Sequence, residues 1–387
     1  ISPDSKAGAM GDVGVATTPD ANSLHWNPAK YVFVDDDMGF AVSYVPWLRA
    51  LVPDINLSYL AGYRKLNDNE AIAMELRYFS LGKIELFDEQ ASPLGVENPS
   101  ELSIAGSYAL KLSDYYSMGV TLRYIRSDLS INVQNTDIQA INALGVDISG
   151  FYQSEEEYYS DFNGRWRAGF AIQNLGPKIK YDDAGRENFL PTNLKLGAGF
   201  DFIFDDYNKL AVTAEFTKLL VPTPAIYEFD PSTNSYNLIS GRTNDVGVIS
   251  GMLQSFYDAP GDALKDEAGD YIQNADGSYQ IKKGSKFREE LNEINIATGL
   301  EYWYNNVLAI RGGFFYEAKT KGNRQYLNFG VGFKYNMFGI DISYLASVSG
   351  RQSPLANTLR FTLRLNLDGG GKSSGGSTPK TDTDNTK

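Results

Sequence analysis

The sequence contains no cysteine and only one histidine, His25, among its 387 residues. Without cysteine there is no disulfide framework, and zinc, haem and thiol sites are almost excluded. No apolar run approaches the roughly 18 residues that a transmembrane helix requires. The first residues, ISPDSKAGAMGD, lack the basic start and apolar core of a signal peptide, as expected of a mature chain that has already been processed. A net charge of -13 argues against nucleic acid as a partner, because such a partner selects a basic surface.

The chain is instead rich in aromatic residues and glycine, with 25 Tyr, 21 Phe and 37 Gly. From residue 39 onward it divides into segments of about ten or more residues in which apolar and polar side chains alternate. The segment 324–336 is typical: Leu327, Phe329, Val331, Phe333 and Tyr335 alternate with Asn328, Gly330, Gly332 and Lys334. A nearly pure apolar row of this length, with Tyr and Phe at its ends, indicates strands that cross a lipid bilayer.

The alternation predicts an all-β protein, a 14-stranded antiparallel transmembrane β-barrel of the bacterial outer membrane. The strands are expected at 39–48, 54–65, 70–82, 99–112, 115–129, 144–153, 165–180, 192–204, 208–221, 293–304, 306–318, 324–336, 339–349 and 355–367. The sixth strand has the weakest pattern, but an even number of strands supports it. Bacterial barrels have an even strand number, with short turns on one side of the membrane and long loops on the other. With this count the short links lie in the periplasm, the long ones outside the cell, and both termini in the periplasm.

The second row of the strands carries charges of both signs. It comprises Glu75, Arg77, Arg123, Arg167, Lys195, Asp201, Glu215, Glu301, Arg311, Glu317, Lys334, Asp341, Arg360 and Arg364. Such a mixture predicts a lumen that is cross-linked by ion pairs or plugged, rather than a pore selective for ions of one sign.

Three regions lie outside the alternating pattern. Residues 1–38 do not alternate, so we interpret them as a segment that could plug the barrel of residues 39–367. A loop of about seventy residues, 222–292, is too long for a simple turn, and loops of such length are usually functional or disordered. Residues 368–387 are polar and rich in Gly and Ser, which predicts a disordered periplasmic tail.

The residue types that usually perform catalysis are poorly placed. His25 is the only imidazole, no G-x-S-x-G motif accompanies it, and packing against the barrel wall is the expected role. Asp35, Asp36 and Asp37 could offer oxygen ligands to calcium, but the spacing of an EF-hand is missing and a solvated charge cluster is favoured. We therefore expect no enzymatic activity, no cofactor and no metal.

Two outer loops carry apolar residues whose exposure to water would be unfavourable. The first, VPWLRALVPD at 45–54, places Val45, Trp47, Leu48, Leu51 and Val52 around Arg49, either for contact with a partner or folded back over the barrel rim. The second is the long loop, whose VGVISGMLQSFY stretch contributes Ile249, Met252, Leu253 and Phe256. The candidates for partner binding are Trp47, Leu48, Leu51, Val52, Ile249, Met252, Leu253 and Phe256.

Three motifs, AGAMGDVGVATTPDANSLHWNPAKYVF, AIQNLGPKIKYDD and FLPTNLKLGAGF, make the chain recognisable. In combination they resemble the PorV family, outer-membrane proteins of the type IX secretion system of Bacteroidetes and relatives of the FadL long-chain fatty acid transporters. The likeness extends over nearly the whole chain. One departure from ordinary outer-membrane barrels is the polar tail, because the chain does not end on an aromatic strand terminus.

The resemblance implies a 14-stranded barrel with an N-terminal hatch, in which Asn22, Trp26, Asn27 and Pro28 lie. It also implies a non-enzymatic shuttle in the outer membrane. Such a protein binds the C-terminal signal domains of secreted cargo at a large translocon and delivers them to a sortase-like attachment complex at the cell surface. The alternative is a FadL-like channel for long-chain fatty acids or other hydrophobic molecules, which would need an apolar path that the charged lumen row argues against.

Overall fold

The computed structural model describes residues 2–49, 52, 54–88, 90–129, 139–180, 185, 187–348 and 358–367. The predicted tail at 368–387 and Leu51 of the first outer loop lie outside the described residues.

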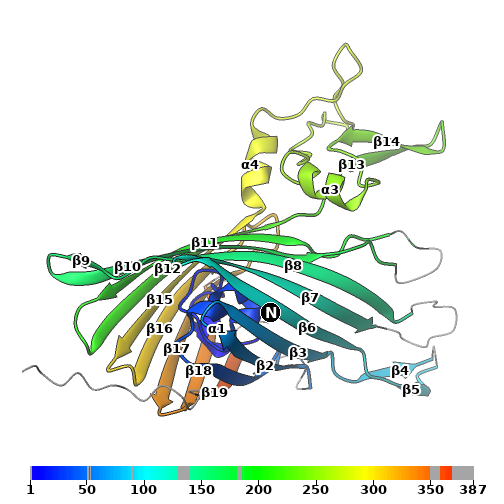
Figure 1. The fold of residues 1–387 in the computed structure, drawn as a ribbon. Coiled ribbons are helices and arrows are strands. Elements are labelled where there is room, and N and C mark those ends of the chain that lie inside the picture. Colours follow the sequence, from blue (N-terminus) through cyan, green and yellow to red (C-terminus); the bar gives the residue numbers. More distant parts are fainter. Residues whose placement is uncertain are drawn as a thin grey trace, which may run out of the picture.

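Fourteen antiparallel strands form a closed barrel, as the alternation predicts (Figure 1). The barrel closes because β1 pairs with both β2 and β19, and β10 pairs with both β8 and β11. Its strands are β1 (Met38–Pro46), β2 (Asn56–Asn67), β3 (Glu70–Ser80), β6 (Ser100–Ser113), β7 (Tyr116–Asp128), β8 (Ile141–Gln153), β10 (Phe162–Leu175), β11 (Asn193–Ile203), β12 (Asn208–Leu219), β15 (Ile294–Tyr304), β16 (Leu308–Tyr316), β17 (Gln325–Tyr335), β18 (Phe338–Ser347) and β19 (Thr358–Leu367).

The side chains alternate between an outer and an inner row along these strands. In β1, Phe40, Val42 and Tyr44 are exposed on the outside, whereas Ala41 and Ser43 are buried. The predicted charged row faces the lumen, where Glu75, Arg123, Arg167, Glu215, Glu301, Arg311, Asp341, Arg360 and Arg364 are all buried. This arrangement gives lipid an apolar wall and leaves polar groups to pair inside.

The two ends of the barrel differ in their connections. Short turns such as 114–115, 204–207 and 305–307 define the short-turn end. In the turn after β15, Asn305 and Asn306 both adopt the left-handed conformation, with φ of 53° and 52°, which asparagine tolerates better than most residues. The opposite, long-loop end carries the connections 47–55, 81–99, 176–192, 220–293 and 317–324.

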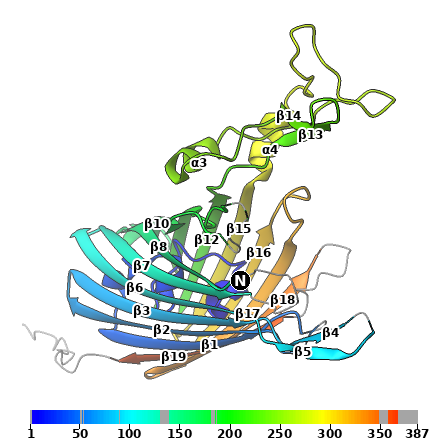
Figure 2. The same cartoon turned by 90° about the vertical axis from the view of Figure 1, so that its right-hand side faces the viewer.

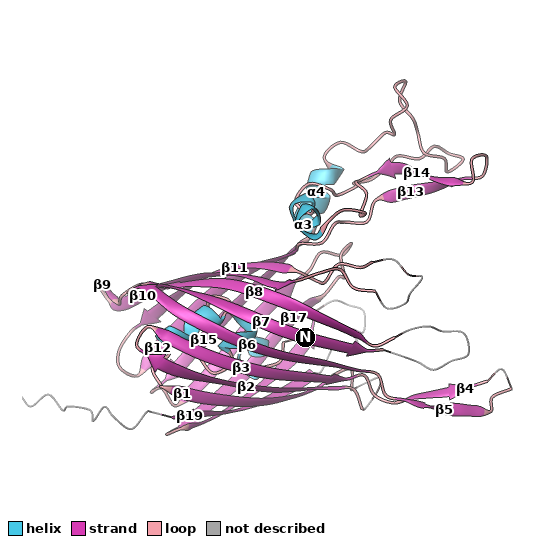
Figure 3. Ribbon diagram, turned by 45° about the vertical axis from the view of Figure 1, so that its right-hand side comes forward, coloured by secondary structure: helices cyan, strands magenta, loops and turns pink. Residues whose placement is uncertain are grey.

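Several smaller elements lie outside the predicted strands. The loop after β3 contains the hairpin β4 (Ile84–Phe87) and β5 (Pro93–Glu97), and β9 (Glu157–Tyr159) extends the edge of β10 at the short-turn end. The long loop folds into the hairpin β13 (Ile226–Asp230) and β14 (Ser235–Ser240) and the helices α3 (Val248–Gln254) and α4 (Ser285–Asn292). Residues 220–293, here called the outer subdomain, stand clear of the barrel wall (Figure 2). Figure 3 shows that its two helices lie on the side nearer the barrel. Among the described residues, no helix is both long and apolar enough to cross a membrane.

Candidate functional site

The N-terminal segment, residues 2–37, lies inside the barrel (Figure 1). It contains three short helical turns, α1 (Ser5–Ala9), α2 (Ser23–Trp26) and η1 (Pro28–Phe33). Almost every residue from 2 to 34 is buried. Where the segment approaches the wall most closely, the inner row carries glycines, among them Gly299, Gly313 and Gly330. At Gly313 a Cβ atom would lie only 2.1 Å from the backbone nitrogen of Gly11, so only glycine fits there without displacing the segment.

Hydrogen bonds from the wall fix the backbone of this segment. The Glu215 carboxylate of β12 accepts the N–H groups of Gly14 and Val15 at 2.8 and 2.9 Å. Arg167 of β10 donates to the Ala16 carbonyl at 2.9 Å. Because a buried N–H or C=O group without a partner costs about 1–3 kcal/mol, these contacts hold one conformation of the segment against the wall.

The four predicted hatch residues are all inside the barrel. The Trp26 indole donates to Asp4 Oδ2 at 2.7 Å, and the Asn27 amide donates to the carbonyls of Val15 and Gly150 at 3.0 and 2.9 Å. Pro28 occupies the first position of η1, and Asn22 is buried with its backbone N–H bonded to Asp20. That the segment closes the lumen to solutes stays a prediction.

Ion pairs cross-link the lumen on two sides of the N-terminal segment. Arg311 donates to Glu301 at 2.6 Å and to Asp341 at 2.7 Å, and Arg364 donates to the second oxygen of Asp341 at 2.6 Å. On the other side Arg123 of β7 bridges Glu75 of β3 and Asp147 of β8. Buried charges need such partners, since an isolated one would cost several kcal/mol.

A vestibule of about 290 Å³ remains above the N-terminal segment at the long-loop end. His25 and Trp26 contribute to its lining, together with Lys195, Tyr326 and Trp47 from the strands and loops around them. The His25 ring meets the Tyr59 ring edge-on at 6.2 Å, which matches the expected packing against the wall. The Lys195 ammonium lies over the Trp26 ring at 4.5 Å.

The first outer loop is less exposed than its sequence predicts. Val45 is fully buried as part of β1, which corrects its assignment to the loop, because the strand continues to Pro46. Trp47 and Leu48 are half-buried, and Trp47 packs edge-on against Phe79 of β3 at 5.4 Å. Val52 is exposed. Trp47 therefore folds back over the rim, the alternative that its sequence left open.

The outer subdomain carries the second predicted cluster. Ile249 and Leu253 of α3 are each 61% exposed and Phe256, just beyond the helix, is 48% exposed, whereas Met252 is half-buried. Ile249 and Leu253 are four residues apart and so share one face of α3. Sequence reasoning missed Phe287 and Leu291 of α4, which are exposed at the same spacing. A four-residue spacing on a short polar stretch was the signal that could have revealed them.

A polar clamp anchors the base of the outer subdomain to the barrel. Lys218 of β12 and Lys321 of the 317–324 loop both donate to the Glu293 carboxylate, at 2.7 and 2.9 Å, and the Thr223 hydroxyl donates to it at 2.7 Å. Glu289 and Glu290 of α4 extend the clamp to the same two lysines. Burial raises the pKa of Glu293, but the hydrogen bonds from Lys218, Thr223 and Lys321 outweigh it and hold that pKa below its usual range. The subdomain thus has a fixed base.

Solved structures with a similar course of the chain include the Pseudomonas putida toluene transporter TodX, with 12% identity, coverage of 94% of this chain and 98% of the other, and a TM-score of 0.48. The Ralstonia pickettii toluene transporter TbuX has 11% identity, coverage of 94% and 98%, and a TM-score of 0.46. A Pseudomonas aeruginosa FadL homologue has 10% identity, the same coverage of 94% and 98%, and a TM-score of 0.42. No curated protein matches the sequence.

The match of the sequence to a family model is more specific than these structural likenesses. The family model of the type IX secretion system protein PorV matches residues 1–226, which include the N-terminal segment and the barrel strands from β1 to β12. This match covers more than half of the chain and includes the three motifs on which the resemblance rests. The chain therefore belongs to the PorV family and is an outer-membrane barrel component of the type IX secretion system.

Proposed function

We propose that this protein is a non-enzymatic carrier for secreted proteins. Its long-loop end faces the outside of the cell and both termini lie in the periplasm. The outer loops bind the C-terminal signal domain of a cargo protein at the large translocon. The carrier then delivers that cargo to the sortase-like attachment complex.

The observation that carries the proposal is the apolar face of α3 on an anchored subdomain. Ile249 and Leu253 are exposed side by side, with Phe256 close behind them. Apolar clusters exposed to water favour contact with a partner, and a few such residues usually provide most of the binding energy. The clamp at Glu293 holds this face in place before binding, so less conformational entropy is lost when a partner docks.

The test is a pull-down with the tagged, full-length protein from solubilised outer membranes. The wild type is expected to recover cargo and a very large translocon complex. The double variant I249D/L253D is expected to recover much less cargo, because two carboxylates at the apolar face would have to be desolvated on binding. The control is L264D, the same leucine-to-aspartate change at another exposed leucine of the subdomain.

Heat-modifiable migration on gels confirms in each case that the barrel is folded. Unchanged recovery with I249D/L253D would remove α3 from the interface. Recovery of neither cargo nor translocon by the wild type, together with fatty acid uptake into proteoliposomes, would refute the carrier function.

A further inference from the structure

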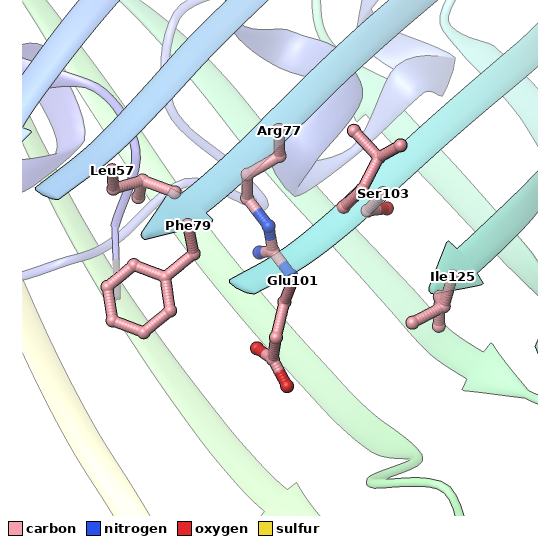
Figure 4. Close-up of a pocket in the computed structure, with 7 residues that line it drawn as sticks. Leu57, Arg77, Phe79, Glu101, Ser103 and Ile125 are labelled. Atoms are coloured by element: carbon pink, nitrogen blue, oxygen red, sulfur yellow. The ribbon is translucent and has the colours of Figure 1, made fainter. Parts of the chain in front are cut away.

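A small pocket opens on the lumen side of β2, β3, β6 and β7, near the long-loop end (Figure 4). Its volume is about 180 Å³, and it is lined by Leu57, Arg77, Phe79, Glu101, Leu102, Ser103 and Ile125. In Figure 4, Leu57 and Phe79 lie on one side of the Arg77 guanidinium and Ile125 on the other. The register places Arg77 opposite Ser103 and Phe79 opposite Glu101, so the lining residues are direct neighbours across the strands.

Arg77 differs from the other lumen arginines. Arg123, Arg167, Arg311, Arg360 and Arg364 each form an ion pair with a carboxylate. In the part of the chain that the structure describes, the Arg77 guanidinium donates no hydrogen bond and forms no ion pair. It is nevertheless half-buried among apolar side chains. A guanidinium in such surroundings is best satisfied by a planar anion that accepts two parallel hydrogen bonds.

The nearest carboxylates are engaged elsewhere. One oxygen of Glu75 accepts from Arg123 and the other from the Tyr59 hydroxyl, at 3.0 Å. Glu101 accepts the Ser127 hydroxyl at 3.0 Å, and its carboxylate points away from Arg77 in Figure 4. The pocket therefore combines a free cationic donor with an acidic acceptor at its edge, between apolar walls.

The combination fits the end of a polypeptide better than a fatty acid. A terminal residue has a carboxylate for Arg77 and a backbone N–H group that Glu101 can accept, whereas a fatty acid has no donor to offer. The volume is below the roughly 300–1,000 Å³ of sites for drug-sized ligands, so it suits a single apolar residue rather than a long acyl chain. The N-terminal segment also fills the lumen beside the wall.

We propose that this pocket binds the free C-terminal carboxylate of an extended peptide whose last side chain is apolar. The inference rests on the proposed carrier function, and it assigns to the carrier a recognition site for the end of the cargo chain. Trp47 connects this pocket to the outer loops, because its ring packs on Phe79. A cargo domain held by the loops can therefore insert its last residue beside Arg77.

The test uses the purified full-length protein in detergent and a fluorescein-labelled hexapeptide of glycine and serine that ends in leucine. The peptide is prepared with a free C-terminal carboxylate and as the amide, and binding is followed by fluorescence polarisation. The wild type is expected to bind the free acid about ten- to hundredfold more tightly than the amide, since two charge-assisted hydrogen bonds are lost in the amide. This comparison requires no variant to fold.

The variant R77Q is expected to abolish the preference for the free acid. The matched control R126Q is expected to retain it, because Arg126 is exposed on the outer row of β7 near the same end of the barrel. Equal binding of acid and amide by the wild type, binding of neither, or a preference that survives in R77Q would overturn the proposal. Displacement of the peptide by laurate would assign the pocket to a lipid carboxylate instead and would also overturn it.

A parallel cargo pull-down separates this proposal from the carrier function. A wild-type protein that recovers no cargo refutes the carrier function, whatever the peptides do. Peptides that bind without dependence on Arg77, while cargo is still recovered, refute only the pocket.

Discussion

Replacing Arg311 by methionine should destabilise the barrel strongly, because this guanidinium joins two buried carboxylates. Its Nε donates to Glu301 at 2.6 Å and its Nη1 to Asp341 at 2.7 Å, and all three side chains are almost completely buried. Removal of one partner from a buried ion pair typically costs about 3–5 kcal/mol. We expect a loss of about 3 kcal/mol, at the lower end of that range, because Lys6 and Arg364 still face the two carboxylates.

The measurement is the free energy of unfolding in urea, followed by tryptophan fluorescence of the refolded barrel. The control is R126M, whose exposed pair with Asp128 should contribute only about 0–1 kcal/mol. The double variant R311M/E301Q should be less destabilised than R311M, because the second change removes a buried charge that has lost its closest partner. Among the described residues that charge keeps only Lys6 as a cationic partner, at 3.9 Å. An R311M protein within about 1 kcal/mol of the wild type would refute this reasoning, as would a double variant that is less stable than the single one.

Three further predictions concern the N-terminal segment and the clamp. G313A should displace the N-terminal segment, because the new Cβ atom would collide with the Gly11 backbone, and the conductance of the protein in planar bilayers should therefore rise. The control G312A should conduct like the wild type, because its Cβ atom would have only the Asn328 carbonyl oxygen near it, at 4.0 Å. N27A should accelerate hydrogen exchange in the segment, corresponding to a loss of about 1–3 kcal/mol for two broken hydrogen bonds; unchanged exchange would show that Asn27 does not anchor it. Glu293 has a pKa lowered from 4.5, so the stability it gives the clamp is present above about pH 4.5 and is lost as the pH falls through the folded-state pKa. Pepsin should therefore cleave the outer subdomain of E293Q faster than that of the wild type at about pH 5, and the difference should shrink as the pH is lowered through the folded-state pKa. A difference that does not shrink on acidification would contradict the role of this carboxylate.

The barrel could be predicted from the sequence because the lipid bilayer requires one face of every strand to be apolar. Every strand meets lipid on one side, so residues such as Leu327, Phe329 and Val331 must be apolar over the full width of the membrane, and the period-two pattern is strong. All fourteen strands were predicted, with ends that differ from the structure by a few residues. Charges on the opposite row, such as Arg311, were correctly assigned to the lumen for the same reason.

The surroundings of the candidate binding residues were harder to predict, because tertiary contacts decide them. Trp47 is apolar on an outer loop, and only the position of Phe79 determines that it folds back over the rim. Helices α3 (7 residues) and α4 (8 residues) are so short that each offers only one or two apolar pairs at a four-residue spacing, too weak a pattern for the sequence to predict a helix. Arg77 looks like any other lumen arginine in the sequence. Among the described residues it has no ion-pair partner, because Glu75 and Glu101 accept hydrogen bonds from donors on β2 and β7.

The N-terminal segment also constrains the order in which this protein can assemble. The Ser5 N–H group donates to Thr362 Oγ1 of β19, and β19 is also the strand that closes the wall against β1. The surface that receives the start of the chain is therefore complete only once the last strand is in place. Insertion of the N-terminal segment and closure of the wall must therefore be coupled. Contacts between residues so far apart in the chain carry a large entropic cost of loop closure, and such chains fold slowly. A barrel assembled in this way has its interior occupied from the moment it closes.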